Sequence, residues 1–135
     1  MTSSISTTVG DYMNNTIKKI DESAKLIDAA SIMVNQKIGA LIVMKGSEAI
    51  GMLTERDILR AFVKKAEETA VNAYMSTPLI TIDGNARLGR ATQIMASKKI
   101  RRLPVTNSTG EIVGFFNLRD LMNAVHNSFL SLFES

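Results

Sequence analysis

The chain has 135 residues, of which 45% are apolar and 5% aromatic, and its formal net charge is +3. This length is typical of one domain or two very small ones, and the apolar share excludes a chain that stays disordered. Cysteine is absent, which excludes disulfides, thiolate metal sites and cysteine nucleophiles. Because such a composition favours a reducing compartment, we expect a cytoplasmic protein.

The N-terminal residues 1–8 are polar and lack the basic start and the apolar block of a signal peptide. We expect them to form a flexible tail. The longest apolar runs, such as residues 38–44, are far shorter than the roughly 20 residues that a bilayer-spanning helix requires. The sequence therefore predicts no membrane segment.

From residue 9 onward the sequence repeats itself. An offset of 62 positions aligns thirteen identical residues between positions 12 and 43 and their counterparts. One extra residue in the second copy changes the offset to 63, which aligns Gly51, Arg56 and Asp57 with Gly114, Arg119 and Asp120. This density of matches indicates an internal duplication, with repeats at residues 9–66 and 71–128 and the end of the last helix at 129–135.

Each copy predicts the same order of elements: strand, helix, strand, strand and helix. The first strand is predicted at residues 16–20 and 78–82, and Ser23 or Asn85 follows as the helix cap. In the first copy Gly39 is predicted to end this helix. The later strands are predicted at residues 40–44, 49–53, 103–105 and 112–116. The last helix begins at Thr54 or Asn117.

The start of the last helix in each copy admits two interpretations. Thr54 followed three residues later by Asp57 is typical of a capping box, and Asn117 with Asp120 can serve the same purpose. The same groups can face a ligand, because a helix start attracts phosphate and a carboxylate one turn later can accept hydrogen bonds from both hydroxyls of a ribose. Gly51 would allow a close approach to the backbone, so a nucleotide fits all these features.

The duplicated unit ends in Gly-apolar-apolar-Thr-x-x-Asp, with Arg-x-Leu-Pro-Val before it, and it resembles a tandem pair of CBS domains, the Bateman module. The stretches IRRLPV and IVGFFNLRDLM carry this resemblance, which covers roughly residues 9 to 126. It implies a mixed α/β (α+β) fold of two pseudo-symmetric repeats packed as one module. It also implies a stand-alone regulatory module that binds AMP, ADP, ATP or S-adenosylmethionine in clefts between the repeats and modulates a separate partner protein.

By motif position, the resemblance implies roles for individual residues. Asp57 and Asp120 would accept the ribose hydroxyls, and Thr54, with Asn117 at the equivalent place, would contact phosphate. Arg101 and Arg102 would neutralise the phosphate charge. The remaining candidates flank these aspartates or would line the adenine pocket: Arg56, Arg119, Thr16, Ile17, Lys18, Pro78, Leu79, Ile80, Ala40, Leu41, Leu103 and Pro104.

The two copies depart from the family pattern in different ways. Asn117 lacks the hydroxyl that the family most often has there, and the first copy has Gly39 and Ala40 where the second has Arg101 and Arg102. We therefore expect unequal clefts and one dominant nucleotide site that combines a Thr/Asp helix start with arginines from either repeat, and the sequence does not determine which cleft it occupies. The sequence contains no Walker loop, dinucleotide fingerprint or nucleophile elbow, so we expect no enzymatic activity.

Other features leave further possibilities open. The run KKIRR at residues 98–102 holds four of the sixteen basic residues, so a nucleic-acid-binding module is an alternative, and a purely structural dimerisation module is another. The single histidine, His126, cannot build a metal site alone. The last helix has more apolar residues than a small repeat should bury, which predicts a homodimer as in the family: Leu121, Met122, Val125, Phe129, Leu132 and Phe133.

Overall fold

The computed structural model of the chain describes residues 7–133, and the side chains of residues 7–130. Most of the predicted tail and the side chains of Leu132 and Phe133 therefore lie outside the described residues. The chain divides into two units. Residues 17–79 form one, here called the α2 unit, and residues 1–16 with 80–135 form the other, the α4 unit.

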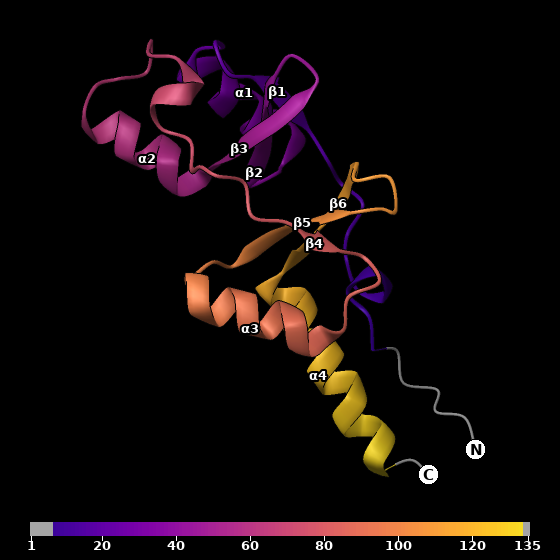
Figure 1. The fold of residues 1–135 in the computed structure, drawn as a ribbon. Helices are drawn as coiled ribbons and strands as arrows, with labels where there is room; N and C mark the ends of the chain where they lie inside the picture. The colour runs from indigo at the N-terminus through magenta and orange to yellow at the C-terminus, as the bar shows by residue number, and fades with distance from the viewer. Residues whose placement is uncertain (1–6, 134–135) are drawn as a thin grey trace. The chain divides into compact units, whose positions relative to one another are not determined.

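The α2 unit contains a three-stranded sheet in the order β1-β2-β3. The strand β1 pairs parallel with β2, and β2 pairs antiparallel with β3. The elements in this unit are β1 (Lys19–Asp21), α1 (Leu26–Gln36), β2 (Ala40–Lys45), β3 (Glu48–Thr54), α2 (Glu55–Val63) and the short 3-10 helix η2 (Val71–Ala73). Its core is formed by fully buried sheet residues, Leu41, Val43 and Leu53, packed with the α1 residues Leu26 and Ala29. Figure 1 draws the three strands of this sheet in indigo to magenta.

The α4 unit has the same arrangement, with strand order β4-β5-β6. Its elements are η1 (Val9–Asp11), β4 (Ile82–Asp83), α3 (Leu88–Lys98), β5 (Arg102–Thr106), β6 (Ile112–Asn117) and α4 (Leu118–Phe133). Leu103, Val105 and Phe116 form the centre of its core. The predicted order of strand, helix, strand, strand and helix is thus confirmed in both copies.

Each unit is completed by a segment that belongs, in sequence, to the other repeat. Val9 is fully buried in the core of the α4 unit, and its counterpart Val71 is fully buried in the core of the α2 unit. A few residues after each valine, the chain forms an antiparallel bridge to the outer strand of the same sheet. Asn14 pairs with Phe115 in β6, and Ser76 pairs with Met52 in β3. The compact units therefore do not coincide with the linear repeats 9–66 and 71–128.

The segments 9–14 and 71–76, here called the added segments, explain why the repeated motif begins with glycine, at Gly51 and Gly114. A Cβ atom at Gly51 would lie 2.7 Å from the carbonyl oxygen of Ser76, and one at Gly114 would lie closer still to the carbonyl oxygen of Asn14. The close approach that Gly51 was predicted to allow is therefore made by the chain's own backbone. This approach leaves no room for a side chain at Gly51 or Gly114.

The predicted caps of the first helix in each copy are wrong. Ser23 and Asn85 instead donate their backbone amides to Asp21 and Asp83 in the turns before the helices. The N-cap position of α1 is Lys25, which makes no side-chain cap bond. The first amides of α1 are satisfied by carbonyl oxygens of the residues 67 and 69, at 2.9 Å each, so tertiary contacts replace a local cap.

The predicted helix end at Gly39 is also wrong. Helix α1 ends at Gln36, and Lys37 adopts the left-handed conformation with φ of 55°. Lys99 ends α3 in the same way, also with φ of 55°. Both units therefore stop this helix with a lysine in a conformation that ordinarily favours glycine.

The first strand of each unit starts later than predicted, at Lys19 and Ile82. In the α2 unit the amide of Ile42 donates to the carbonyl of Lys18 at 2.9 Å, just ahead of β1. The residue equivalent to Ile42 in the α4 unit is Pro104, which has no amide proton to donate. This difference explains why β4 has two residues and β1 has three. No helix within the described range is both long and apolar enough to cross a bilayer.

Candidate functional site

One edge of the sheet in the α2 unit gathers several of the predicted site residues. Ala40 lies opposite Thr54 across β2 and β3, and the amide of Glu55 donates to the carbonyl of Gly39 at 3.2 Å. The hydrogen bond from Ile42 to Lys18 places Lys18 at the same edge. Ala40 and its neighbour Leu41 are buried, whereas Lys18 is exposed. The start of α2 therefore lies beside the segment that leads into β1.

The equivalent edge of the α4 unit is basic. Arg102 lies opposite Asn117 across β5 and β6, and the carbonyl of Arg101 accepts the amide of Leu118 at 2.9 Å. Arg101 is exposed and Arg102 is half-buried, while the next residues, Leu103 and Pro104, are buried. Two arginines thus lie at the start of α4, where the α2 unit has glycine and alanine.

The remaining predicted residues are distributed over both units. The segment 16–18 is divided, since Thr16 belongs to the α4 unit and Ile17 with Lys18 to the α2 unit; the segment 78–80 is divided between Leu79 and Ile80. Thr16 and Pro78 are exposed. Arg56 and Arg119 lie exposed on the first turns of α2 and α4.

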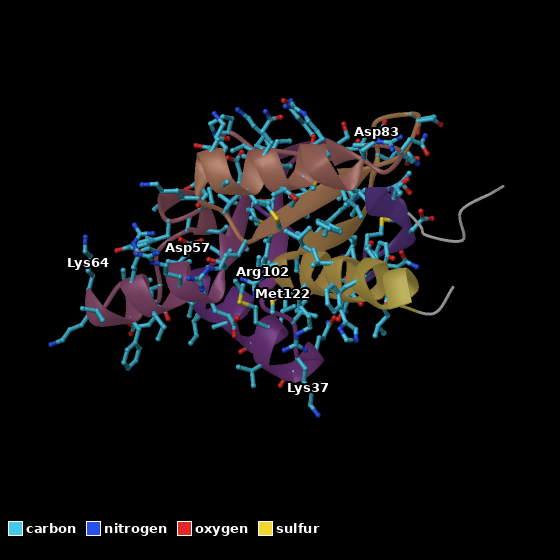
Figure 2. All side chains as sticks on the ribbon, turned by 90° about the horizontal axis from the view of Figure 1, so that it is seen from below. Lys37, Asp57, Lys64, Asp83, Arg102 and Met122 are labelled. Atoms are coloured by element: carbon cyan, nitrogen blue, oxygen red, sulfur yellow. The ribbon has the colours of Figure 1, made fainter. Side chains whose placement is uncertain are left out.

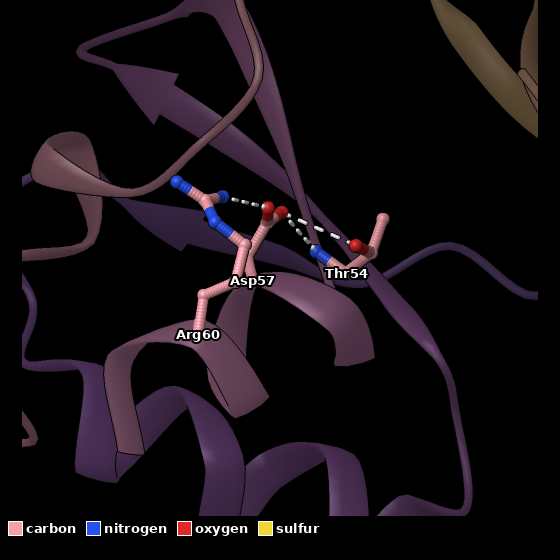
Figure 3. A network of polar contacts seen from close by, with 3 residues as sticks. All are labelled: Thr54, Asp57 and Arg60. Carbon is pink, nitrogen blue, oxygen red and sulfur yellow. Dashed lines mark hydrogen bonds and ion pairs between the residues drawn. The ribbon is translucent and has the colours of Figure 1, made fainter. Parts of the chain in front are cut away.

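The carboxylate at the start of α2 is closely surrounded by donors (Figure 3). Asp57 is only 5% exposed. Its Oδ2 accepts hydrogen bonds from the amide of Thr54 at 2.8 Å and from the Thr54 hydroxyl at 3.2 Å. Its Oδ1 accepts a hydrogen bond from Arg60 at 3.0 Å. The predicted capping box of Thr54 and Asp57 is therefore present.

The carboxylate at the start of α4 accepts fewer hydrogen bonds than the one at the start of α2. Asp120 accepts one hydrogen bond, from the amide of Asn117 to Oδ2 at 2.7 Å, and within residues 7–130 no other donor reaches it. It is half-buried. The side-chain Oδ1 of Asn117 is buried and has no partner within the same residues. Asp120 thus caps its helix, as predicted, and keeps one oxygen available.

Sequence reasoning missed Arg60, which pairs with Asp57 from one turn further along α2. Its guanidinium carbon lies 5.5 Å from the ring centroid of Tyr74, a distance at which the ring attracts the cation. The signals that could have found it are the i,i+3 spacing of the opposite charges and the mismatch with the second copy, where Asn123 occupies the equivalent position.

Two charged groups away from these helix starts have shifted pKa values. The hydrogen bond from the Ser23 hydroxyl, together with that from the Ser23 amide, lowers the pKa of Asp21. The hydrogen bond to Glu68, at 2.9 Å, raises the pKa of Lys25. Both pairs are exposed and hold turns beside α1. Within the described range no group of three or more His, Asp or Glu side chains is placed to hold a metal ion, and His126 is exposed.

Two small α/β units, each with a helix whose first turn carries a capping aspartate beside the sheet edge, define a tandem-repeat module. The family model for the CBS domain matches residues 9–64 and 71–127, and the chain belongs to this family. Tandem CBS domains are generally regulatory and non-catalytic modules. The chain is 36% identical over 115 residues to the CBS domain-containing protein YhcV of Bacillus subtilis (strain 168), which covers 84% of this chain and 81% of that protein.

Solved structures share the fold. The CBS domain protein PAE2072 from Pyrobaculum aerophilum, complexed with AMP, superposes with a TM-score of 0.75 at 22% identity over 84% of this chain and 88% of that one. The CBS domain pair of protein MJ0100, in complex with 5′-methylthioadenosine and S-adenosyl-L-methionine, gives a TM-score of 0.78 at 19% identity over 88% and 99%.

Proposed function

We propose that the protein is a sensor of an adenosine-containing ligand, AMP, ADP, ATP or S-adenosylmethionine, and that ligand binding modulates a separate partner protein. Membership of the CBS family supports a ligand-binding regulatory module. The complexes of PAE2072 with AMP and of MJ0100 with two adenosyl compounds support the class of ligand. A ligand shifts such a module toward the conformation that it binds best, and a partner can recognise that conformation.

The observation that carries this proposal is the start of α4. There an aspartate with an available oxygen, Asp120, lies three residues beyond Asn117, which is paired across the sheet with Arg102. A carboxylate is the natural acceptor for the two hydroxyls of a ribose, and arginines beside a helix start favour a phosphate. We therefore assign the dominant site to the α4 unit, with Leu103, Pro104 and Ile80 as the apolar groups for the base.

Calorimetric titration with AMP tests this assignment. Asp120→Asn keeps an acceptor for the Asn117 amide but removes the charge, and we expect AMP affinity to fall about tenfold to a hundredfold. The matched variant Asp57→Asn should leave the affinity within about twofold, because its carboxylate is already satisfied. Equal losses in both variants would contradict a single dominant site.

The ligand class is tested with close analogues. A site that accepts hydrogen bonds from both ribose hydroxyls should bind 2′-deoxy-AMP far more weakly than AMP. A salt titration separates the nucleic-acid alternative, since the affinity for a nucleic acid falls steeply with salt whereas that for a mononucleotide falls little. A thermal-shift screen with AMP, ADP, ATP and S-adenosylmethionine then ranks the ligands.

We also propose that two copies pair through their repeat helices, in a cytoplasmic homodimer. Apolar side chains on α2 and α4 support this: Phe62 is 69% exposed, Val63 79%, Met122 64% and Val125 61%. A monomer rarely leaves so many large apolar groups in water.

Sedimentation equilibrium tests the dimer. Phe62→Glu and Met122→Glu should each weaken association at least about tenfold, because a buried charge replaces an apolar contact. Val34→Glu on α1, where Val34 is 74% exposed, is the matched control and should leave the dimer unchanged. A wild-type protein that stays monomeric at high concentration would rule this pairing out.

A further inference from the structure

We propose that Arg60 is a latch that keeps Asp57 from binding a ribose, so that the α2 unit holds a closed version of the site that is open in the α4 unit. The inference rests on the proposed function. It goes further because it identifies the residue that sets how many ligands each chain binds. That number depends on the ion pair between Arg60 and Asp57.

The argument begins with the hydrogen-bonding capacity of a carboxylate, which offers roughly four acceptor positions. Three donors already reach Asp57: the Thr54 amide, the Thr54 hydroxyl and Arg60. The one remaining position cannot serve two ribose hydroxyls. Asp120, with one donor, keeps about three positions. A ribose diol therefore fits the second aspartate and not the first.

Arg60 is the donor that can be removed. The Thr54 amide is part of the backbone at the helix start, and its bond to Asp57 is the cap itself. The Thr54 hydroxyl bonds the same oxygen, Oδ2, as the Thr54 amide, so its rotation would leave Oδ1 bonded to Arg60. Arg60 is instead a side chain of which about half is exposed, with a relative side-chain accessibility of 52%. Releasing it frees the Oδ1 of Asp57 without breaking the helix cap.

Tyr74 stabilises the closed position. The Arg60 guanidinium lies 5.5 Å from the centroid of the Tyr74 ring while it donates to Asp57. The charge is thus shared between a carboxylate and an aromatic face, which orders a side chain that would otherwise be flexible. Tyr74 lies between the buried Val71 and the bridging Ser76, so its backbone is fixed by the core of the α2 unit.

The α4 unit contains the matching parts without the latch. Tyr12, the counterpart of Tyr74, packs against its core. The position one turn after Asp120 is occupied by the exposed Asn123, whose uncharged amide makes no bond to Asp120. One residue, arginine in one repeat and asparagine in the other, therefore separates the closed site from the open one.

Exchanging these two residues tests the latch in the full-length protein. Calorimetric titration with AMP should give one site per chain for the wild type and two for Arg60→Asn, which copies the other unit. The control Lys64→Asn removes the same charge from the end of α2, where Lys64 projects from the ribbon (Figure 2), and it should keep one site. The reverse variant Asn123→Arg should weaken the remaining site about tenfold.

A second measurement does not depend on any nucleotide. In the wild type, NMR signals of the Arg60 side chain should show ring-current shifts from Tyr74 and slow exchange with water, and Asp57→Asn should abolish both. A single site in Arg60→Asn would overturn the latch while leaving the proposed function intact. A wild type that binds no AMP, with sites appearing only in Arg60→Asn, would support the latch and contradict the proposed α4 site. Absence of binding in both proteins would overturn both.

Discussion

The starts of α2 and α4 carry the same aspartate three residues beyond the cap, yet the two carboxylates are used differently. Asp57 is buried and holds Thr54 and Arg60, whereas Asp120 holds the Asn117 amide alone. The shared part of the motif is the helix cap. The neighbour one turn later decides whether the carboxylate is satisfied within the chain or available to a ligand, so identical motif residues can have different functions.

The largest expected effect on stability concerns the glycines before these two helices. Gly114→Ala should lower the free energy of unfolding by about 3 kcal/mol and Gly51→Ala by about 2 kcal/mol, because in both cases a Cβ atom would overlap the backbone of the added segment. The order follows from the closer approach in the α4 unit. Urea denaturation measures both values.

Gly89, on α3, is the matched control. A Cβ atom there meets nothing within 4 Å, so Gly89→Ala should stabilise the protein by about 0.5 to 1 kcal/mol through the greater helix propensity of alanine. Tolerance of alanine at Gly51 or Gly114 would show that the added segments do not pack as described.

The two aspartates should also differ in stability. Asp57→Asn removes the negative charge to which Arg60 and Thr54 donate hydrogen bonds. We expect a loss of about 1 to 2 kcal/mol in the free energy of unfolding. Asp120→Asn should cost about 0.5 kcal/mol, because the half-buried carboxylate bonds one amide. Thermal denaturation without ligand measures the difference, and the opposite order would contradict the assignment of Asp57 as the satisfied group.

Much of this arrangement could be predicted from the sequence, because the duplication and the apolar patterning are local signals. They gave the order of elements, the buried strands around Leu41 and Leu103, and the capping box of Thr54 with Asp57. Capping and ligand binding would use the same residues, and only the three-dimensional arrangement determines which donors reach each oxygen.

What could not be predicted depends on contacts between distant residues. Val9 completes the core of the α4 unit and Val71 that of the α2 unit, so each valine packs with the other repeat. No local signal predicts this, since either valine would suit the core of its own repeat. The carbonyls that replace the predicted Ser23 cap of α1 come from residues 67 and 69, just before Val71. The contact of Arg60 with Tyr74 could not be predicted either, because Tyr74 is distant in sequence and lies on the added segment.

A smaller effect is expected at the two lysines with positive φ. Lys37→Gly and Lys99→Gly should each stabilise the protein by about 0.5 to 1 kcal/mol, because glycine adopts the left-handed conformation without steric cost. The two gains should be equal, since both residues have φ of 55°. The Lys37 side chain is exposed and points away from the ribbon, so glycine should lose little packing there (Figure 2). Unequal gains would show that the two helix ends are not equivalent.

The smallest effect concerns Asp21, whose pKa is lowered by the Ser23 hydroxyl. A lowered pKa in the folded state means that this interaction stabilises the protein above the ordinary pKa of 3.8 and is lost as the pH falls through the folded-state value. Ser23→Ala should raise the pKa of Asp21 toward 3.8, as followed by NMR titration, whereas Ser23→Thr should preserve the shift. The same pKa in all three proteins would exclude the hydroxyl as its cause.

The most direct test of the difference between the two helix starts is a crystal structure of the wild-type protein with AMP. The account predicts one nucleotide per chain, with its ribose hydroxyls on Asp120, its phosphate near Arg101 or Arg102, and Arg60 still bonded to Asp57. A ribose bound to Asp57 with Arg60 displaced, while Asp120 stays without ligand, would contradict it.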